Sequence, residues 1–182
     1  MSLKNDELKL HLLKTKPEYR MYGIVPYNIS PIQQAIQFGH AVVEYAQKYF
    51  NDADYQHWAK NHKTFIILNG GTTNNGEEPH DDAMHSEPYV GSMQQYHLEL
   101  MKNKIKHATF YEPDLNDTLT AVVFLVEEHV FDKKKYPDSI DIRDSMLNGV
   151  PVDAKRMKAW ETYIEGKQNI FLREFLSKLR LA

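Results

Sequence analysis

The chain has no cysteine among its 182 residues. This absence excludes disulfides, thiolate nucleophiles and cysteine-based metal sites. No apolar run approaches the roughly 18 residues that a membrane-spanning helix needs. The first ten residues also lack the apolar core of a secretory signal. We therefore expect a cytoplasmic protein that makes no use of a membrane.

Motifs that would hold a cofactor or an activated serine are missing as well. Gly70 and Gly71 belong to neither a G-x-G-x-x-G nor a P-loop motif, and no serine stands in a G-x-S-x-G sequence. The segment HDDAMH, from His80 to His85, offers several metal ligands at a spacing that fits no metal motif. We expect neither a cofactor nor a metal.

The charge balance is slightly acidic, with 22 Lys and Arg against 25 Asp and Glu and a net charge of −3. Such a chain has no overall attraction for nucleic acid, so any contact with RNA requires local basic clusters. The dense clusters are Lys102, Lys104 and Lys106, followed by the run 133–135. Solvated surface lysines are the simpler interpretation of both.

The clearest element is the helix predicted for residues 30–50, SPIQQAIQFGHAVVEYAQKYF. Ser30 can cap it, Pro31 suits the first helical position, and Gln33 completes a capping box. Apolar residues recur at spacings of three and four, which predicts a face that packs on a sheet. Gln37 and His40 interrupt this face one turn apart. The residues of the predicted face are Ile32, Ala35, Ile36, Gly39, Val42, Val43, Ala46 and Tyr49.

The order of elements predicts an α/β fold with three α/β/α layers, a four-stranded mixed sheet and a C-terminal helical extension. Strands are expected at 21–27, 63–69, 107–113 and 118–128, the last two forming an antiparallel hairpin. Helices are expected at 30–50, 52–62, 92–106 and 153–181, with a long loop at 70–92. The chain thus divides into a leader (1–20), an α/β domain (21–128) and the extension (129–182).

One group of polar residues could carry chemistry. If the first long helix lies on the sheet, Gln37 and His40 approach the hairpin turn that holds Asp114, Thr118 and Thr120. An imidazole, an amide, a carboxylate and hydroxyls could together bind water and polarise an ester carbonyl. Alternatively, Gln37 and His40 are buried and hydrogen-bonded, and Asp114 merely forms the turn. The residues alone leave both interpretations open.

Three features follow one another between residues 20 and 126: AIQFGHA (35–41), Trp58 before KTFIIL (63–68), and FYEPDLNDTLTAVVFLV (110–126). In these features the chain resembles the type II peptidyl-tRNA hydrolases. The family patterns are G-K-x-A-A-Q-x-x-H-A in the helix and D-A-G-x-T followed by T-V-L-A-I-G-P in the hairpin. The family's lysine falls on Gln33 here, its turn glycine falls on Asn116, and the closing I-G-P is absent.

The resemblance implies hydrolysis of the ester between a peptide and tRNA. In that case the catalytic residues are His40, Asp114, Thr118 and Thr120. The expected substrate-binding residues are Gln33, Gln37, Lys102 and Lys106. The alternative is a catalytically inactive member of the fold that acts as a binding or protein-interaction module. The expected partners are tRNA and, through the C-terminal helices, a second copy of the chain in a homodimer.

Overall fold

A computed structural model of the chain describes residues 16–73, 91–138 and 154–182. Several sequence-based expectations fall outside these ranges. They are most of the leader, the central part of the 70–92 loop with His80 and His85, and a short helical segment expected at 139–146.

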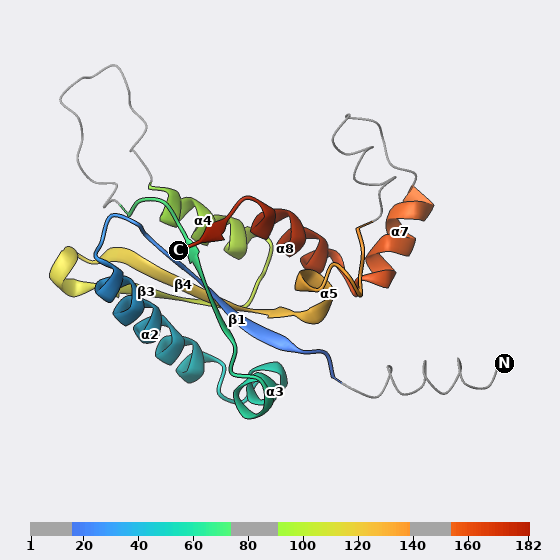
Figure 1. Ribbon diagram of the computed structural model, residues 1–182, viewed down its shortest axis with the longest axis horizontal. Helices are drawn as coiled ribbons and strands as arrows, with labels where there is room; N and C mark the ends of the chain where they lie inside the picture. Colours follow the sequence, from blue (N-terminus) through green and yellow to red (C-terminus); the bar gives the residue numbers. More distant parts are fainter. Residues whose placement is uncertain (1–15, 74–90, 139–153) are drawn as a thin grey trace, which may run out of the picture.

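The described residues form a mixed sheet of five strands in the order β3-β4-β1-β2-β5 (Figure 1). Strands β1 and β2 are parallel, and every other neighbouring pair is antiparallel. The four predicted strands are present, and the β3–β4 hairpin is confirmed. The fifth strand has only two residues, too few for any sequence pattern to indicate it. The strands are β1 (Tyr19–Val25), β2 (Phe65–Asn69), β3 (His107–Glu112), β4 (Thr118–Glu127) and β5 (Arg180–Leu181).

Helices cover both faces of the sheet, as the α/β/α prediction requires (Figure 1). Helices α2 and α3 pack on one face, and α4 and α8 pack on the other. Among the described helices, none is both long and apolar enough to cross a membrane. The helices are α2 (Pro31–Lys48), α3 (Ala53–Asn61), α4 (Ser92–Lys102), α5 (Glu128–Phe131), α7 (Ala154–Tyr163) and α8 (Lys167–Ser177), with a 3-10 turn η1 (Pro113–Leu115).

The central strand β1 joins the two cores. Met21 and Val25 face α2 and α3, whereas Tyr22 and Ile24 face α4 and α8, as alternation along a strand dictates. Between them stands Gly23, where an added Cβ would lie 2.2 Å from the Phe38 ring. A glycine at this position therefore lets α2 approach the sheet closely.

Helix α2 begins as predicted, but it packs with a different face. Ser30 and Gln33 form the expected capping box, with reciprocal bonds of 3.3 Å and 3.0 Å. The buried residues of the helix are Gln37, Phe38, Ala41 and Tyr45. The predicted face is wrong for Ile32, Ile36 and Val43, which are exposed, Ile32 at 74%. Large aromatic side chains gain most from burial, so Phe38 and Tyr45 set the orientation of the helix.

Two histidines link α4 to the start of β3. His107 is buried and its Nδ1 lies 2.7 Å from the carbonyl oxygen of Ile105, so that nitrogen must carry the proton. Its Nε2 is then an acceptor for Nδ1 of His97, 3.1 Å away. Burial lowers the pKa of both imidazoles. Both rings are therefore favoured in the neutral form.

Stability is expected to fall as the pH drops below about 6.5, the ordinary value for histidine. The unfolded chain then binds protons that the folded pair resists, so the free energy of unfolding decreases by up to about 1.4 kcal/mol per pH unit for each site. Denaturant titrations at pH 7.5, 6.5 and 5.5 measure this slope. His97→Gln should flatten it, because one of the two neutral imidazoles is then absent. Equal slopes in the wild type and His97→Gln would contradict the prediction.

Candidate functional site

A hydrogen-bonded cluster joins α2 to the hairpin at one end of the sheet. Gln37 of α2 is buried, and its Oε1 accepts a bond of 2.9 Å from the Thr120 hydroxyl of β4. Its Nε2 donates to a carboxylate oxygen of Glu112, the last residue of β3. We refer to Gln37, Glu112 and Thr120 as the amide cluster. It fixes the helix relative to the hairpin through bonds that a buried amide requires.

His40 lies one turn further along α2 and is exposed. Its ring contacts Phe110 of β3 edge to face, with the ring centroids 4.5 Å apart. The Phe110 carbonyl also lies 3.3 Å from the Thr120 hydroxyl, so the histidine stands directly beside the amide cluster. The alternative of a buried, satisfied histidine therefore does not hold for His40, whose imidazole is accessible to water.

Asp114 is exposed in η1, between β3 and β4. The turn is held at both ends, since Glu112 caps it through the Asp114 backbone N–H and the Thr118 hydroxyl donates to the Leu115 carbonyl at 2.5 Å. Asn116 adopts a left-handed conformation with φ 54°. Asparagine tolerates this conformation better than most residues other than glycine, so Asn116 suits this position of the turn.

The structure brings some of the predicted site residues together and separates others. Gln37 and Thr120 are directly bonded, and His40, Asp114 and Thr118 flank them at the same end of the sheet. The Gln33 side chain is engaged in the helix cap. Lys102 ends α4 and Lys106 precedes β3, which places both at the opposite end of the sheet. Their role in substrate binding stays a prediction.

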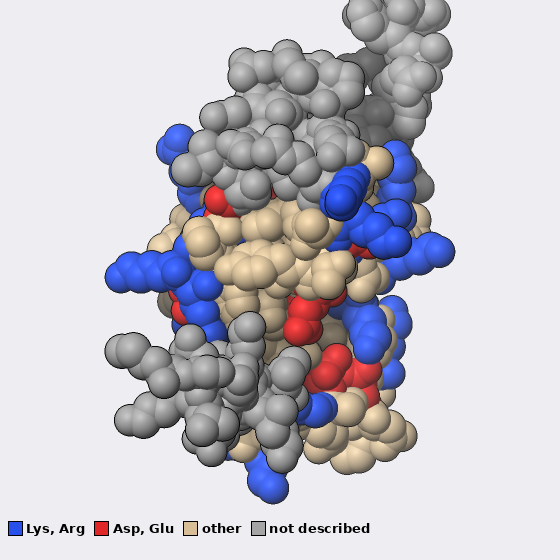
Figure 2. Space-filling model, turned by 90° about the vertical axis from the view of Figure 1, so that its right-hand side faces the viewer, with Lys and Arg blue, Asp and Glu red and all other residues tan. Residues whose placement is uncertain are grey.

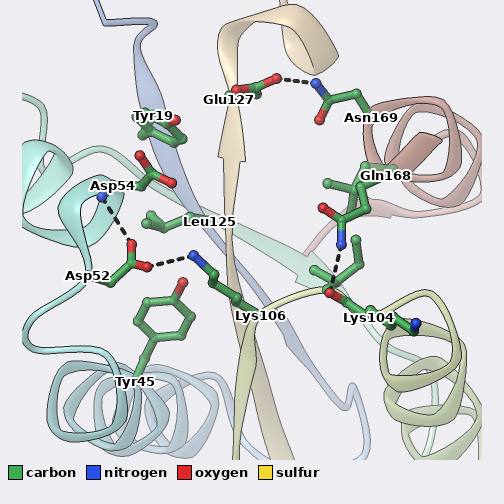
Figure 3. Close-up of a pocket in the computed structure, with 12 residues that line it drawn as sticks. Tyr19, Tyr45, Asp52, Asp54, Lys104, Lys106, Leu125, Glu127, Gln168 and Asn169 are labelled. Atoms are coloured by element: carbon green, nitrogen blue, oxygen red, sulfur yellow. Dashed lines mark hydrogen bonds and ion pairs between the residues drawn. The ribbon is translucent and has the colours of Figure 1, made fainter. Parts of the chain in front are cut away.

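That opposite end holds a pocket of about 170 Å³ (Figure 3). Lys106 lines it and forms a 2.6 Å ion pair with Asp52, the residue that caps α3. The hydrogen bond to Asp52 raises the pKa of Lys106. The ion pair engages one of the two lysines that were expected to bind a substrate. The lining residues are Tyr19, Tyr45, Asp52, Asp54, Lys104, Ile105, Lys106, Leu125, Glu127, Gln168, Asn169 and Leu172.

The pocket is predominantly acidic on the side of β4. Burial raises the pKa of Glu127, against the opposing effect of a hydrogen bond from Asn169. Burial also raises the pKa of Tyr19, and the nearby carboxylates of Asp54 and Glu127 add to this effect. Burial is the larger cause of both shifts, and the carboxylates of Asp54 and Glu127 lie together near Tyr19. A cation is therefore better suited to this end of the molecule than a phosphate.

Sequence reasoning missed two acidic residues that the structure makes central. Glu112 and Glu127 each end a strand that is otherwise largely apolar. A carboxylate in that position, followed in one case by Pro113, was the available signal. It was weak, because a strand commonly ends in a polar residue that only meets solvent.

No protein-family model matches the chain, and no curated protein matches it either. The arguments on function therefore rest on the residues themselves and on the resemblance described from them.

The side chains beside the amide cluster include groups suited to acid–base chemistry. His40 and Asp114 are exposed titratable groups, and the amide cluster behind them fixes their supporting elements. An imidazole can take a proton from water, and a carboxylate can orient either the water or the imidazole. Gln37 is too deeply buried to touch a substrate and is better described as a positioning residue.

Proposed function

We propose that the chain is a peptidyl-tRNA hydrolase, which cleaves the ester between a peptide and the 3′ end of tRNA. The observation that carries the proposal is the amide cluster, which anchors exposed His40 and Asp114 at one end of the sheet. The AIQFGHA and PDLNDT segments, which carry the family resemblance, supply three of these residues, namely Gln37, His40 and Asp114.

In the proposed reaction, water attacks the ester carbonyl while His40 accepts its proton. Asp114 orients the water. Return of the proton to the ribose oxygen releases tRNA and a free peptide carboxylate. Thr118 and Thr120 are both committed to bonds within the fold. We therefore assign Thr118 to holding the turn that carries Asp114, and Thr120 to holding the amide cluster.

The order of elements also supports the proposal. Parallel strands β1 and β2 end beside the start of α2, and the first residues of antiparallel β4 lie at the same end of the sheet. In α/β sheets, ligands commonly bind at the carboxyl ends of parallel strands. Asn28 of the β1–α2 connection and Thr73 after β2 exchange two hydrogen bonds of 3.3 Å and 3.2 Å. These bonds hold the two connections together at the end of the sheet that carries the candidate residues.

The second candidate is an inactive member of the fold that acts as a protein-interaction module. The observation that favours it is the row of exposed aliphatic residues on the outer face of α2, namely Ile32, Ile36 and Val43. Exposed apolar patches often mark interaction sites. Formation of a homodimer is compatible with either candidate and stays a prediction.

The decisive test is hydrolysis of purified peptidyl-tRNA, measured as the release of labelled peptide. The wild type should release peptide well above the rate in buffer, and Asp114→Asn should lose about 10²- to 10⁴-fold, the usual contribution of a positioned acid–base group. Asp117→Asn is the matched control, because Asp117 is exposed in the same turn and has no assigned role. It should keep nearly the wild-type rate.

Two outcomes would contradict the proposal. If the folded wild type releases no peptide, the interaction module is favoured instead. If Asp114→Asn and Asp117→Asn are equally active, hydrolysis does not take place at the amide cluster.

A further inference from the structure

Three potential metal ligands meet where β4 passes into α5 and where α7 passes into α8. Glu127 ends β4, His129 lies in α5, and Glu165 lies between α7 and α8. One ligand atom from each of them lies within 4.8 Å of the others. We refer to these residues as the Glu-His-Glu cluster. It lies at the end of the sheet opposite the amide cluster, and Glu127 also lines the pocket described above.

His129 is the residue that needs explanation. It is only 8% exposed, and no described residue forms a hydrogen bond with its Nδ1. A buried ring nitrogen without a partner costs free energy comparable to a lost hydrogen bond. That nitrogen nevertheless lies 3.4 Å from a carboxylate oxygen of Glu127, at a geometry that makes no hydrogen bond. The buried Nδ1 of His129 therefore needs a bonding partner that the described residues do not supply.

The spacing is that of two ligands on one metal ion. Nitrogen and carboxylate oxygen bind Zn²⁺ at about 2.0 to 2.2 Å, so two ligands of a tetrahedral ion are about 3.3 to 3.5 Å apart. The separation of 3.4 Å between His129 Nδ1 and Glu127 Oε1 falls within this range. Glu165 approaches the same imidazole, with an oxygen 3.6 Å from Nε2. Because its side chain is exposed, a rotation can bring that oxygen to the ion.

The surroundings hold the ligands in place. Asn169 of α8 donates to Glu127, and the same amide donates to the Ile164 carbonyl at 2.6 Å. The Tyr136 ring packs against the imidazole with centroids 4.2 Å apart. Residue Glu165 adopts a left-handed conformation with φ 60°, which turns the chain after α7 and carries its side chain to His129. Supporting contacts of this kind orient the ligands in metal sites.

The field at this end of the molecule also favours a cation. Besides burial, the negative charges of Glu165 and Asp54 raise the pKa of Glu127. The charges of Asp54, Glu127 and Glu165 likewise raise the pKa of Tyr19, in addition to its burial. Figure 2 shows this side of the molecule, with acidic side chains near the middle and lower part of the face and lysines and arginines mainly around its edges. The guanidinium of Arg173, which donates to the His129 carbonyl, is also engaged by Asp138.

We propose that Glu127, His129 and Glu165 bind one divalent transition-metal ion. An imidazole with two carboxylates suits Zn²⁺ and its neighbours better than Mg²⁺ or Ca²⁺, which prefer sets of oxygen ligands. Three protein ligands leave a coordination position for water. The ion joins the end of β4 to the α7–α8 connection, and it stabilises the folded chain because the unfolded chain lacks the assembled site.

Titration of the EDTA-treated full chain with Zn²⁺ tests the proposal, with Mg²⁺ as the comparison ion. Calorimetry should show one Zn²⁺ per chain, and the melting temperature should rise with Zn²⁺ concentration but not with Mg²⁺. Co²⁺ in place of Zn²⁺ should give the visible absorption of a low-coordinate nitrogen and oxygen site. The probe is the metal alone, so the result does not depend on whether the chain hydrolyses peptidyl-tRNA.

Glu165→Gln is the critical variant, because the exposed side chain can change without disturbing the core. It should weaken Zn²⁺ binding tenfold or more and abolish the thermal shift. Glu174→Gln, the same change at another exposed residue of the extension, should bind as the wild type does. The absence of binding in the wild type, or equal binding by both variants, would overturn the site. His129 would then be a histidine paired with two carboxylates and no metal.

Discussion

Phe175→Ala is expected to lower the free energy of unfolding by about 3 to 5 kcal/mol, the usual cost of emptying a buried phenylalanine site. Phe175 of α8 is 0% exposed. Its ring lies 5.3 Å from Phe171, 5.7 Å from Tyr96 and 6.0 Å from Phe124. Because the free energy of unfolding of such a domain is only about 5 to 15 kcal/mol, the variant should lose a large part of its stability. Chemical denaturation measures the change directly.

Phe50→Ala is the matched control, since Phe50 is 62% exposed. Its effect should stay within about 0.5 kcal/mol, as for most surface substitutions. The contrast also tests how the C-terminal region relates to the sheet. If Phe175→Ala left the main unfolding transition unchanged, α8 would unfold separately from the core that contains Phe124.

Arg173→Ala is expected to cost about 3 to 5 kcal/mol, the range measured when one partner of a buried ionic network is removed. The guanidinium of Arg173 is buried and donates to the carbonyls of His129 and Tyr136 and to Asp138, the last at 2.7 Å. These contacts join α8 to α5 and to the segment that follows it. Removing the side chain takes the guanidinium donor from two carbonyls and leaves Asp138 with Lys133 as its remaining ion-pair partner, a loss that thermal and chemical denaturation should reveal.

Arg173→Lys distinguishes charge from geometry. Lysine keeps the charge but lacks the planar fork that reaches several acceptors at once, so it should recover only part of the lost stability. Arg180→Ala, at an exposed arginine, should change stability little. Full recovery by Arg173→Lys would show that the charge alone matters and that the fork does not.

The sequence predicted much of the architecture because local signals agreed with each other. The capping box at Ser30 and Gln33 set the start of α2, and the dense β-branched run at 118–126 identified the strand that pairs with both β1 and β3. These signals are local and need no knowledge of the partner element. Strand β5 could not be predicted, because two residues become a strand only by pairing with β2.

The orientation of α2 and the partners of its polar residues were harder to predict. Apolar residues occur around most of this helix, so periodicity alone could not decide whether Ile36 or Phe38 faces the sheet. The candidate site depended on the same decision. Gln37 was recognised as part of it, but Glu112, which accepts from its amide, lies 75 residues away in the sequence. A pairing over that distance has no local signature.

The arrangement of the sheet has a consequence for how the chain folds. Strand β1 pairs along its length with β4, and the paired residues are about 100 positions apart in the sequence. Closing so long a loop is entropically costly and slows folding. During synthesis, β1 must wait for one of its two neighbours until most of the chain has left the ribosome. The β3–β4 hairpin, whose strands are joined by a short turn, can form first and serve as the template on which β1 then docks.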